Sequence, residues 1–471
     1  MMIIMGEKTE GQMLAEKLFY KSENSFEKLD ASETERAFEY ANGYKKFLDN
    51  AKTEREAVKC AEAMAAERGF VPYSFGDELK AGGKYYCNNR GKSLFVFKIG
   101  SEPISNGIRI AAAHIDSPRL DLKPRPVYED GELGFFKTHY YGGIKKYQWT
   151  AIPLALHGRV ILAGGSTVDI TIGEDENDPV LYINDLPPHL AQNQSQQTLS
   201  VAIEGVSLNI LVGSRPYPDT EVGDKIKLNI LSILNEKYGI TEADLISAEL
   251  SAVPAAKARD AGLDRSMIAS YGHDDRVCAY PSLTAIFDDA CASTHTVMAV
   301  LADKEETGSD GNTGMKSAFL RDLISEIAKA FGESDAVVRA NSKCLSADVN
   351  VAFDPNFPEV FEKRNTAFLN HGVVISKYTG ARGKSGTSDA SAEFLGYIRS
   401  IFEKNDVIWQ IAELGKVDQG GGGTVAAYIA NLNIDVIDLG VPVLSMHAPT
   451  EVIAKLDVYM AHRAMLALFN E

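Results

Sequence analysis

The sequence predicts an α/β protein in which a layered α/β domain with a central mixed sheet is interrupted by an inserted β-rich domain. Two observations lead to this prediction. The 471 residues are too many for one ordinary hydrophobic core, so two domains are expected. Strand-like and helical segments alternate after residue 274, whereas residues 120–254 consist mainly of short strand-like runs.

The N-terminal part supplies helices and then strands. Residues 10–68 carry Glu and Lys interleaved with Leu, Phe and Ala at helical spacing, which predicts charged amphipathic helices. Residues 93–114 contain the apolar runs SLFVFKIG and GIRIAAAHID, bounded by Gly and Asn and rich in branched or aromatic side chains. These two runs are predicted to be strands.

The segment 120–254 has a different sequence pattern. Its runs IPLALHGRVIL, STVDITIG, PVLYIND and VSLNILVG are short, strand-like and separated by Gly, Asp, Asn and Pro, and helical periodicity is scarce through most of it. The segment has the size of a domain, so we expect a β-rich unit of its own.

After residue 274 the chain alternates between two kinds of segment. Helices are expected in CAYPSLTAIFDDAC, TGMKSAFLRDLISEIAKAF, DASAEFLGYIRSIFEK and a last helix through Leu468; strands are expected in THTVMAVLAD, KCLSADVNVAF, HGVVISKY, DVIWQIAE and LGVPVLSMHA. Two sequential domains would leave the strands before residue 119 without partners. We therefore assign residues 1–119 and 255–471 to one domain and residues 120–254 to an insertion.

Composition narrows the class of protein. The formal charge of −17, with no Lys/Arg run longer than Lys145-Lys146, argues against nucleic acid as a partner. Five widely spaced cysteines without a CxxC pair indicate reduced thiols in a cytoplasmic protein. The N-terminus lacks the pattern of a signal peptide, and no stretch of about 18 uncharged apolar residues predicts a membrane span.

Acidic and imidazole side chains occur where strands should end, the edge at which open α/β sheets place their active sites. The first are His114 and Asp116, which project to the same face of an extended chain, so that Asp116 can orient the ring of His114 toward a metal. The second are Asp274 and Asp275, which precede a helix. Their alternative role is helix capping, and that of His114 is a strand-end histidine.

Three further positions complete this set. Glu305 and Glu306 follow the run TVMAVLAD, and one carboxylate could bind metal while the other takes a proton from water; alternatively, they form a solvated acidic turn. Asp348 lies in the strand-like run CLSADVNVAF, unless the strand ends before it. His447 terminates the run VPVLSM and could also be structural. Two histidines and several carboxylates without cysteine suit Zn²⁺, Mn²⁺ or Co²⁺, and are enough for two ions.

The chain resembles the aspartyl aminopeptidases, metallopeptidase family eighteen. The resemblance rests on ordered motifs over nearly the whole chain: AAHIDSPRL, the DDR segment, KEETGS, SADVN, LGVPVLSMHA and the YGG at Tyr141. It implies a soluble aminopeptidase with two divalent ions per subunit, zinc or else Co or Mn, acting on peptides with a free N-terminus.

The resemblance also implies a role for each candidate residue. One zinc would be bound by His114 and Asp348 and the other by Glu306 and His447, with Asp274 as the bridge, although Asp275 remains an alternative to Asp274. Glu305 would be the general base and Asp116 the partner of His114.

The family fold implies a catalytic domain interrupted by a β-rich dimerisation domain, assembled as a dodecamer built from dimers. Within PHLA, His189 resembles a histidine that reaches the active site of a neighbouring subunit; its alternative is a surface histidine in a proline turn. In the stretch GKSGTSDA, Lys384 could bind acidic substrates, but the family's arginine is absent and Asp389 stands in place of Asn. The preferred N-terminal residue, acidic or neutral, therefore stays open.

Two other functions share these features. A related dinuclear-metal deacylase acting on N-acyl amino acids would have the same metal ligands and a different cleft wall. A non-catalytic oligomeric scaffold would keep the fold, but the complete ligand set and Glu305 argue against it. The Gly-rich stretch 420–423 lacks the GxxxxGK[ST] pattern of a phosphate loop.

Overall fold

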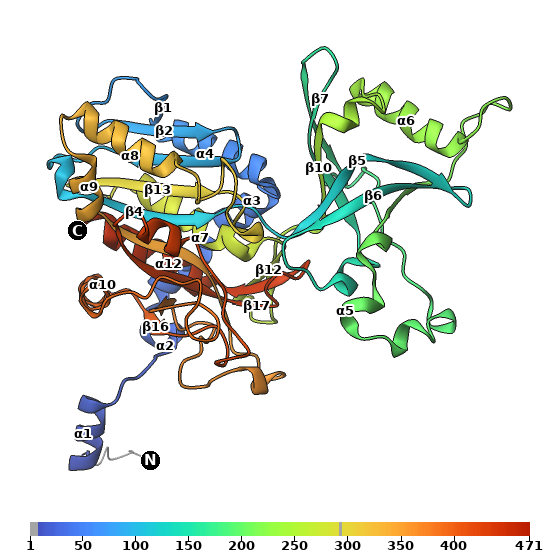
Figure 1. The fold of residues 1–471 in the computed structure, drawn as a ribbon. Helices are drawn as coiled ribbons and strands as arrows, with labels where there is room; N and C mark the ends of the chain where they lie inside the picture. The colour runs from blue at the N-terminus through green and yellow to red at the C-terminus, as the bar shows by residue number, and fades with distance from the viewer. Residues whose placement is uncertain (1–7, 292–293) are drawn as a thin grey trace.

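The computed structural model describes residues 8–291 and 294–471, and its strands form two sheets (Figure 1). Strands from both sides of the segment 120–254 join one twelve-stranded mixed sheet, in the order β1-β2-β3-β13-β4-β14-β17-β18-β12-β11, with β15 and β16 attached to β17. Its strands are β1 (Val71–Pro72), β2 (Lys84–Asn89), β3 (Ser93–Lys98), β4 (Ile108–His114), β11 (Arg259–Ala261), β12 (Met267–Ser270), β13 (Thr296–Ala302), β14 (Lys343–Val351), β15 (Val373–Ser376), β16 (Trp409–Ile411), β17 (Asp435–Leu444) and β18 (Glu451–Ala454).

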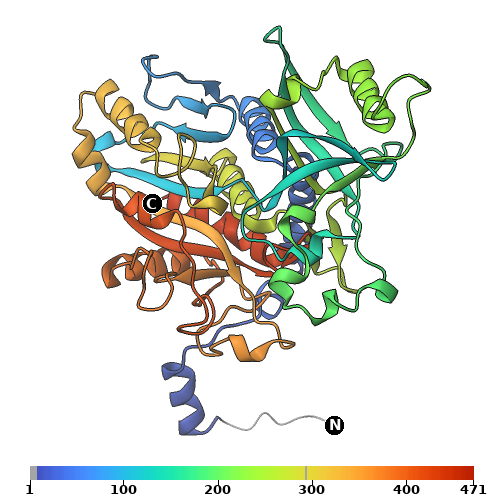
Figure 2. The same ribbon diagram turned by 45° about the vertical axis from the view of Figure 1, so that its right-hand side comes forward.

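The second sheet is six-stranded and antiparallel, and it stands beside the first (Figures 1 and 2). Its strands, in the order β8-β7-β10-β5-β6-β9, are β5 (Arg119–Asp130), β6 (Leu133–Tyr141), β7 (Leu154–Ile161), β8 (Thr167–Ile172), β9 (Ile210–Gly213) and β10 (Ala248–Pro254). Gly131 and Glu132 both have positive φ, at the two-residue turn between β5 and β6.

The described residues outside segment 120–254 form ten α-helices, most of which cover the two faces of the large sheet. They are α1 (Glu10–Leu18), α2 (Ser25–Lys28), α3 (Ala31–Asn50), α4 (Glu54–Glu67), α7 (His273–Phe287), α8 (Phe319–Ala330), α9 (Asp335–Asn341), α10 (Ala392–Lys404), α11 (Ala426–Ala430) and α12 (Lys455–Phe469). The helices α3, α4, α7, α10 and α12 contribute to the apolar cluster on one face, and α8, α9 and α11 to the cluster on the other.

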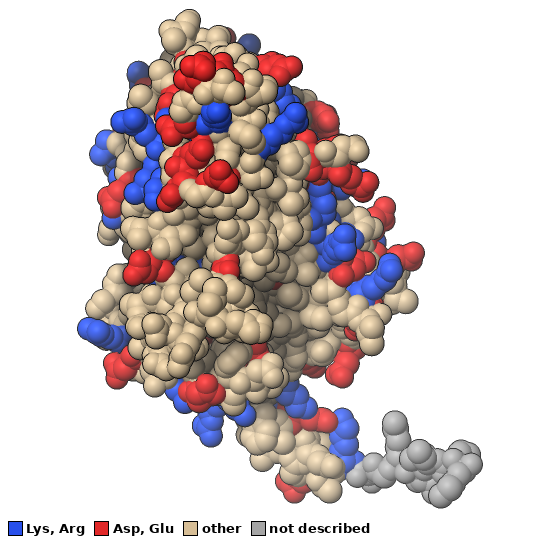
Figure 3. Space-filling model, turned by 90° about the vertical axis from the view of Figure 1, so that its right-hand side faces the viewer, with Lys and Arg blue, Asp and Glu red and all other residues tan. Residues whose placement is uncertain are grey.

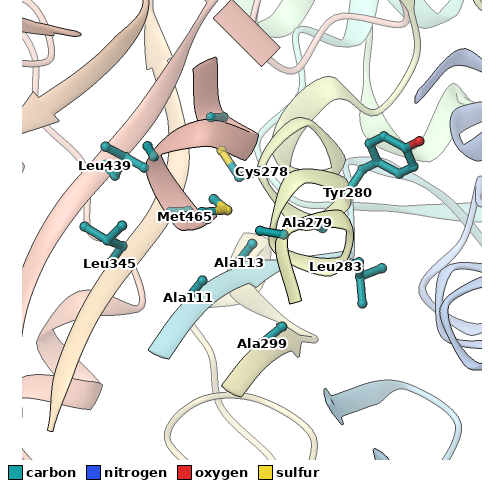
Figure 4. Close-up of a cluster of buried hydrophobic side chains, with 14 of the residues drawn as sticks. Ala111, Ala113, Cys278, Ala279, Tyr280, Leu283, Ala299, Leu345, Leu439 and Met465 are labelled. Atoms are coloured by element: carbon teal, nitrogen blue, oxygen red, sulfur yellow. The ribbon is translucent and has the colours of Figure 1, made fainter. Parts of the chain in front are cut away.

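The central strand β4 shows why this sheet is buried on both sides. Ala111 and Ala113 belong to one apolar cluster, whereas Ile110 and Ala112 belong to the other, as the two-residue period of a strand requires. In the close-up of Figure 4, the small side chains of β4 lie beneath Ala279 of α7. Alanine on the strand leaves room for the helix to pack closely over it.

Local sequence signals set the ends of the N-terminal helices. The Asp30 side chain accepts a hydrogen bond from the Glu33 N–H at the start of α3, and Thr53 and Glu56 form a capping box at the start of α4. By contrast, α1 buries none of its residues and stands away from the body (Figure 2). None of the helices within the described ranges is long and apolar enough to cross a membrane.

Two of the expectations for segment 120–254 were wrong. The run PVLYIND is not a strand but makes isolated bridges at Leu181 and Tyr182, because the adjoining prolines and aspartates favour irregular backbone. The segment also contains α6 (Lys225–Tyr238), whose apolar residues at 226, 230 and 234 follow a helical period, and the short α5 (Leu199–Ala202).

Candidate metal centre

The predicted residues meet at one edge of the large sheet. The strands β13, β4, β14 and β17 are neighbours and run parallel, so their carboxyl ends lie side by side. His114 is the last residue of β4, Glu305 and Glu306 form a 3₁₀ turn just after β13, and His447 follows β17. Asp348 lies within β14, which continues to Val351, so the alternative in which the strand ends before Asp348 is wrong.

Asp274 lies between the two histidines. Its Oδ1 is 3.0 Å from Nε2 of His114, and its Oδ2 is 3.0 Å from Nε2 of His447. Asp348 lies on the His114 side, with Oδ1 3.6 Å from that Nε2, and Glu306 lies on the His447 side, with Oε1 3.5 Å from that Nε2. The Glu305 carboxylate is 3.9 Å from the His114 ring.

Asp275 faces away from this arrangement. Its Oδ2 accepts the backbone N–H of His114 at 3.2 Å, which is the main-chain side of that residue. Both aspartates have non-helical backbone angles at the start of α7, and the peptide bond between them is cis. The N-cap is instead Gly272, in the left-handed region and without a side-chain capping bond, so the helix-capping alternative for the aspartates is wrong.

Within the described ranges, the partners of the carboxylates of this centre are the two histidines rather than lysine or arginine. In the described ranges, no lysine or arginine forms an ion pair with Asp274, Glu305, Glu306 or Asp348. The buried Oδ1 of Asp274 and Oε1 of Glu306 accept no hydrogen bond from the residues that the structure describes. A buried carboxylate without compensation is costly, so this site requires positive charge from elsewhere.

The pKa values reflect the same imbalance. Burial, together with the charges of Asp348 and Asp274, raises the pKa of Glu305 to about 8. Burial and the charge of Asp274 raise the pKa of Glu306 well above its ordinary value. Burial opposes protonation of His447, but Asp274 and Glu306 raise its pKa to about 10. Burial of the two glutamates and the carboxylates next to His447 thus favour the protonated forms of these three side chains.

The donor set fits divalent metal. Ligand atoms of His114, Glu305 and Asp348 lie within 4.8 Å of one another, as do those of His114, Asp274 and Glu306. Imidazole nitrogen and carboxylate oxygen without thiolate are the ligands of zinc, manganese and cobalt in hydrolases. These two groups overlap at His114, and His447 lies beside the second.

Asp116 holds the turn that carries the two glutamates. Its carboxylate accepts the backbone N–H groups of Glu305 at 3.1 Å and Glu306 at 3.2 Å. The Nδ1–H of His114 donates to the backbone carbonyl of Asp116 at 3.0 Å, and the nearer carboxylate oxygen is 3.4 Å away. The acceptor that orients His114 is thus the main chain of Asp116 rather than its side chain.

Glu451 is a residue of this centre that sequence reasoning missed. It is buried at the start of β18 and accepts the backbone N–H groups of Asp274 at 3.1 Å and His447 at 2.7 Å. The available signal was an acidic residue opening the apolar run EVIA, four residues after His447.

Neither of the two residues predicted to bind substrate contacts this centre within one protomer. His189 lies in an exposed 3₁₀ turn (Pro188–Leu190) beside the six-stranded sheet. The Nζ of Lys384 is 2.9 Å from Asp389 Oδ2 and 3.8 Å from the centre of the Tyr378 ring. Asp389 also pairs with Lys377, at 2.9 Å.

Comparison with known proteins identifies the family. The chain matches the family described as Aminopeptidase I zinc metalloprotease (M18) over residues 47–469. It is 48% identical over 461 residues to a probable M18 family aminopeptidase 1 of Clostridium acetobutylicum, covering 96% of this chain and 99% of that protein.

Two crystal structures have the same fold. Aminopeptidase I from Clostridium acetobutylicum superimposes with a TM-score of 0.91 at 45% identity, covering 96% of this chain and all of that one. An M18 aminopeptidase from Thermotoga maritima has a TM-score of 0.91 at 40% identity, covering 96% of this chain and 99% of that one. The chain therefore belongs to the M18 family of zinc metallo-aminopeptidases.

Proposed function

We propose that this aminopeptidase removes N-terminal residues from peptides at a centre for two divalent ions, with Glu305 as general base. One observation carries the proposal: the Asp274 carboxylate has one oxygen 3.0 Å from each of two imidazoles, with Asp348 and Glu306 on either side. A carboxylate in that position is suited to bridge two ions.

The ligands divide into two sets that share Asp274. His114 and Asp348 would hold one ion, and Glu306 and His447 the other. When bound, such ions would lower the pKa of a water and polarise the scissile carbonyl. Zinc is the expected metal, with cobalt and manganese as alternatives of the same ligand preference.

Glu305 supplies the proton transfer. Its side chain is 19% exposed, against 3% for Glu306, so Glu305 is the member of the pair that solvent and substrate can reach. Its carboxylate would take a proton from the attacking water and return it to the leaving amine. The remaining acidic charge of the site favours a substrate with a free, cationic N-terminus.

We infer a preference for neutral over acidic N-terminal residues. Lys384 is paired with Asp389, and the same carboxylate also pairs with Lys377. A substrate carboxylate would have to compete with Asp389 for either lysine. On this account Asp389→Asn shifts the ratio of kcat/KM for acidic over neutral substrates upward by about 3-fold, since a contact between exposed charges is worth about 0.6 kcal/mol.

A panel of aminoacyl-nitroanilides, assayed with and without a chelator, tests the activity. We expect metal-dependent release of neutral residues; cleavage of N-acetyl amino acids alone would favour a deacylase, and no hydrolysis of either class would favour an oligomeric scaffold. The same panel with Asp389→Asn tests the specificity, and an unchanged ratio would exclude Asp389 as its determinant.

The inserted domain is the proposed dimerisation domain. Five apolar side chains in residues 186–206, the stretch that contains the 3₁₀ turn Pro188–Leu190, are more than half exposed: Leu186, Leu190, Leu199, Val201 and Val206. On the side of the molecule shown in Figure 3, acidic and basic side chains are interspersed above a broad area with few charges. The solved structure of mApe1 from S. cerevesiae, which is 21% identical to this chain with a TM-score of 0.75, is a dodecamer.

We propose the same kind of assembly here, with residues 120–254 forming the dimer contact and His189 reaching the partner's cleft. Light scattering on the purified chain tests the assembly. Leu190→Asp should dissociate it, and a monomeric wild-type protein with full activity would contradict the role of His189.

A further inference from the structure

The inserted domain touches the candidate metal centre through three consecutive residues, Tyr141-Gly142-Gly143, of which Tyr141 ends β6 and the two glycines follow it. The pairing of β5 with β6 sets Tyr141 opposite Arg119, three residues after Asp116. This pairing places the three residues next to the end of β4, whose last residue is His114. In Figure 1 the base of the β5–β6 hairpin points toward the large sheet.

Tyr141 acts on Asp116. Its hydroxyl donates to Asp116 Oδ2 at 2.7 Å, beside the two backbone N–H groups of the Glu305–Glu306 turn. The Arg119 guanidinium lies 4.0 Å from the centre of the Tyr141 ring and fixes its orientation from behind. The hydroxyl thus supplies the third donor that holds the Asp116 carboxylate in place.

Gly143 acts on His447. The Nδ1–H of His447 donates to the Gly143 carbonyl at 2.7 Å. A carbonyl only accepts, so this bond fixes the proton on Nδ1 and leaves Nε2, which faces Asp274, free to bind metal. His447 is the most exposed ligand of the set, with a side chain 33% exposed, and needs such an anchor most.

Gly142 makes room for Glu306. A Cβ at Gly142 would lie 3.0 Å from Glu306 Oε2 and 3.3 Å from Glu306 Cβ. The residue also has φ of 74°, which favours glycine. A side chain at this position would therefore press on Glu306 and shift it by a few tenths of an ångström.

We propose that Tyr141-Gly142-Gly143, although part of the inserted domain, is a positioning element of the metal centre that sets its affinity for divalent ions. The inference rests on the proposed two-ion function. It assigns the inserted domain a part in each protomer's own site, because both His447 and the Glu305–Glu306 turn are braced from that domain. None of the three residues is itself a ligand.

Zinc affinity of the full-length apo-protein, measured by competition with a chromophoric chelator, tests the proposal without using catalysis. We expect Gly142→Ala to weaken zinc binding by about 100-fold and Tyr141→Phe by about 10-fold, the range found when groups that orient metal ligands are removed. Tyr141→Phe should lower kcat by a similar factor with little change in KM. The absorption spectrum of the Co²⁺ form should change in both variants.

Two matched controls separate positioning from general damage. Gly165 also has positive φ, of 82°, but has nothing within 4 Å of an added Cβ, so Gly165→Ala carries the same backbone strain away from the centre. Tyr140 is the exposed neighbour of Tyr141, at 43%, and Tyr140→Phe removes a hydroxyl that does not reach Asp116.

The outcomes distinguish the two levels of the account. If the wild type takes up no zinc, the proposed function fails and this inference fails with it. If the wild type binds zinc but both variants bind it as tightly as their controls, the proposed function stands and the positioning role is overturned. Should Gly142→Ala fold poorly, Tyr141→Phe against Tyr140→Phe decides the question alone.

Discussion

Buried carboxylates occur in two regions of this protein and are treated in opposite ways. At the junction between the two sheets, Glu54 is buried and the Glu174 side chain is 12% exposed, and each meets cations from the chain. Arg119 lies 3.1 Å from Glu54, and Lys52 lies 2.6 Å from Glu174. Burial alone would raise the pKa of Glu174, but His157, Lys257 and Lys52 lower it to about 2.

At the metal centre the balance is reversed. Glu306 is as buried as the junction glutamates, yet burial and Asp274 raise its pKa well above the ordinary value. Both regions are costly to form from charged groups. The opposite pKa shifts indicate that the carboxylates of the junction are already compensated by cations of the chain. The carboxylates of the centre are instead arranged for cations that come from outside the chain.

Removing the proposed base should have the largest effect. Glu305→Gln keeps the shape of the side chain but cannot take a proton, and general base catalysis contributes up to about 10⁴-fold. We expect kcat to fall by about 10³-fold while zinc content stays at the wild-type level. Glu10→Gln, on the exposed α1, serves as control, and full turnover by Glu305→Gln would show that another group is the base.

Breaking the junction should affect stability rather than chemistry. Lys52→Met leaves Glu174 with fewer partners, and removing one member of a buried pair costs about 3 kcal/mol. Urea unfolding should show this loss, while kcat per folded protomer stays within about two-fold. Lys80→Met, at an exposed pair, should change stability by less than about 0.5 kcal/mol. Equal effects from the two variants would mean that the junction does not stabilise the fold.

A smaller effect is expected from His157 at the junction, whose contribution to stability should depend on pH. His157 contacts Glu56 at 2.7 Å and Glu174 at 3.1 Å; burial opposes its protonation, but these bonds raise its pKa above the ordinary 6.5. The contribution of these bonds to the free energy of unfolding is therefore complete below pH 6.5, and it is lost as the pH rises through the pKa of His157 in the folded protein.

The measurement is the difference in unfolding free energy between the wild type and His157→Gln across pH 6 to 9. We expect the difference to be largest at pH 6 and to shrink as pH rises. A difference that stays constant over this range would show that His157 is neutral in the fold.

The sequence predicted much of the site because its residues sit at strand ends, and strand ends are visible as breaks in apolar runs. The run IRIAAAH predicted both the strand β4 and the place of His114. What could not be predicted depends on contacts between distant segments. Glu451 meets the backbone of Asp274 across 177 positions of sequence, and nothing local marks that pairing.

The choice between Asp274 and Asp275 was beyond sequence reasoning for another reason. The two residues are both aspartate and differ only in where their side chains point. That orientation follows from the non-helical backbone at the start of α7. That geometry turns Asp274 toward both imidazoles and Asp275 toward the backbone N–H of His114. The helix α6 was missed because most of the segment around it consists of strand-like runs.

The central claim is that Asp274 is shared by two ions, and the zinc content of the purified protein tests it most directly. The chain should bind two zinc ions per protomer after dialysis against excess metal, and Asp274→Ala should lose both, whereas Asp275→Asn should keep them. A wild type that binds one ion or none, or an Asp274→Ala variant that retains two, would contradict the account.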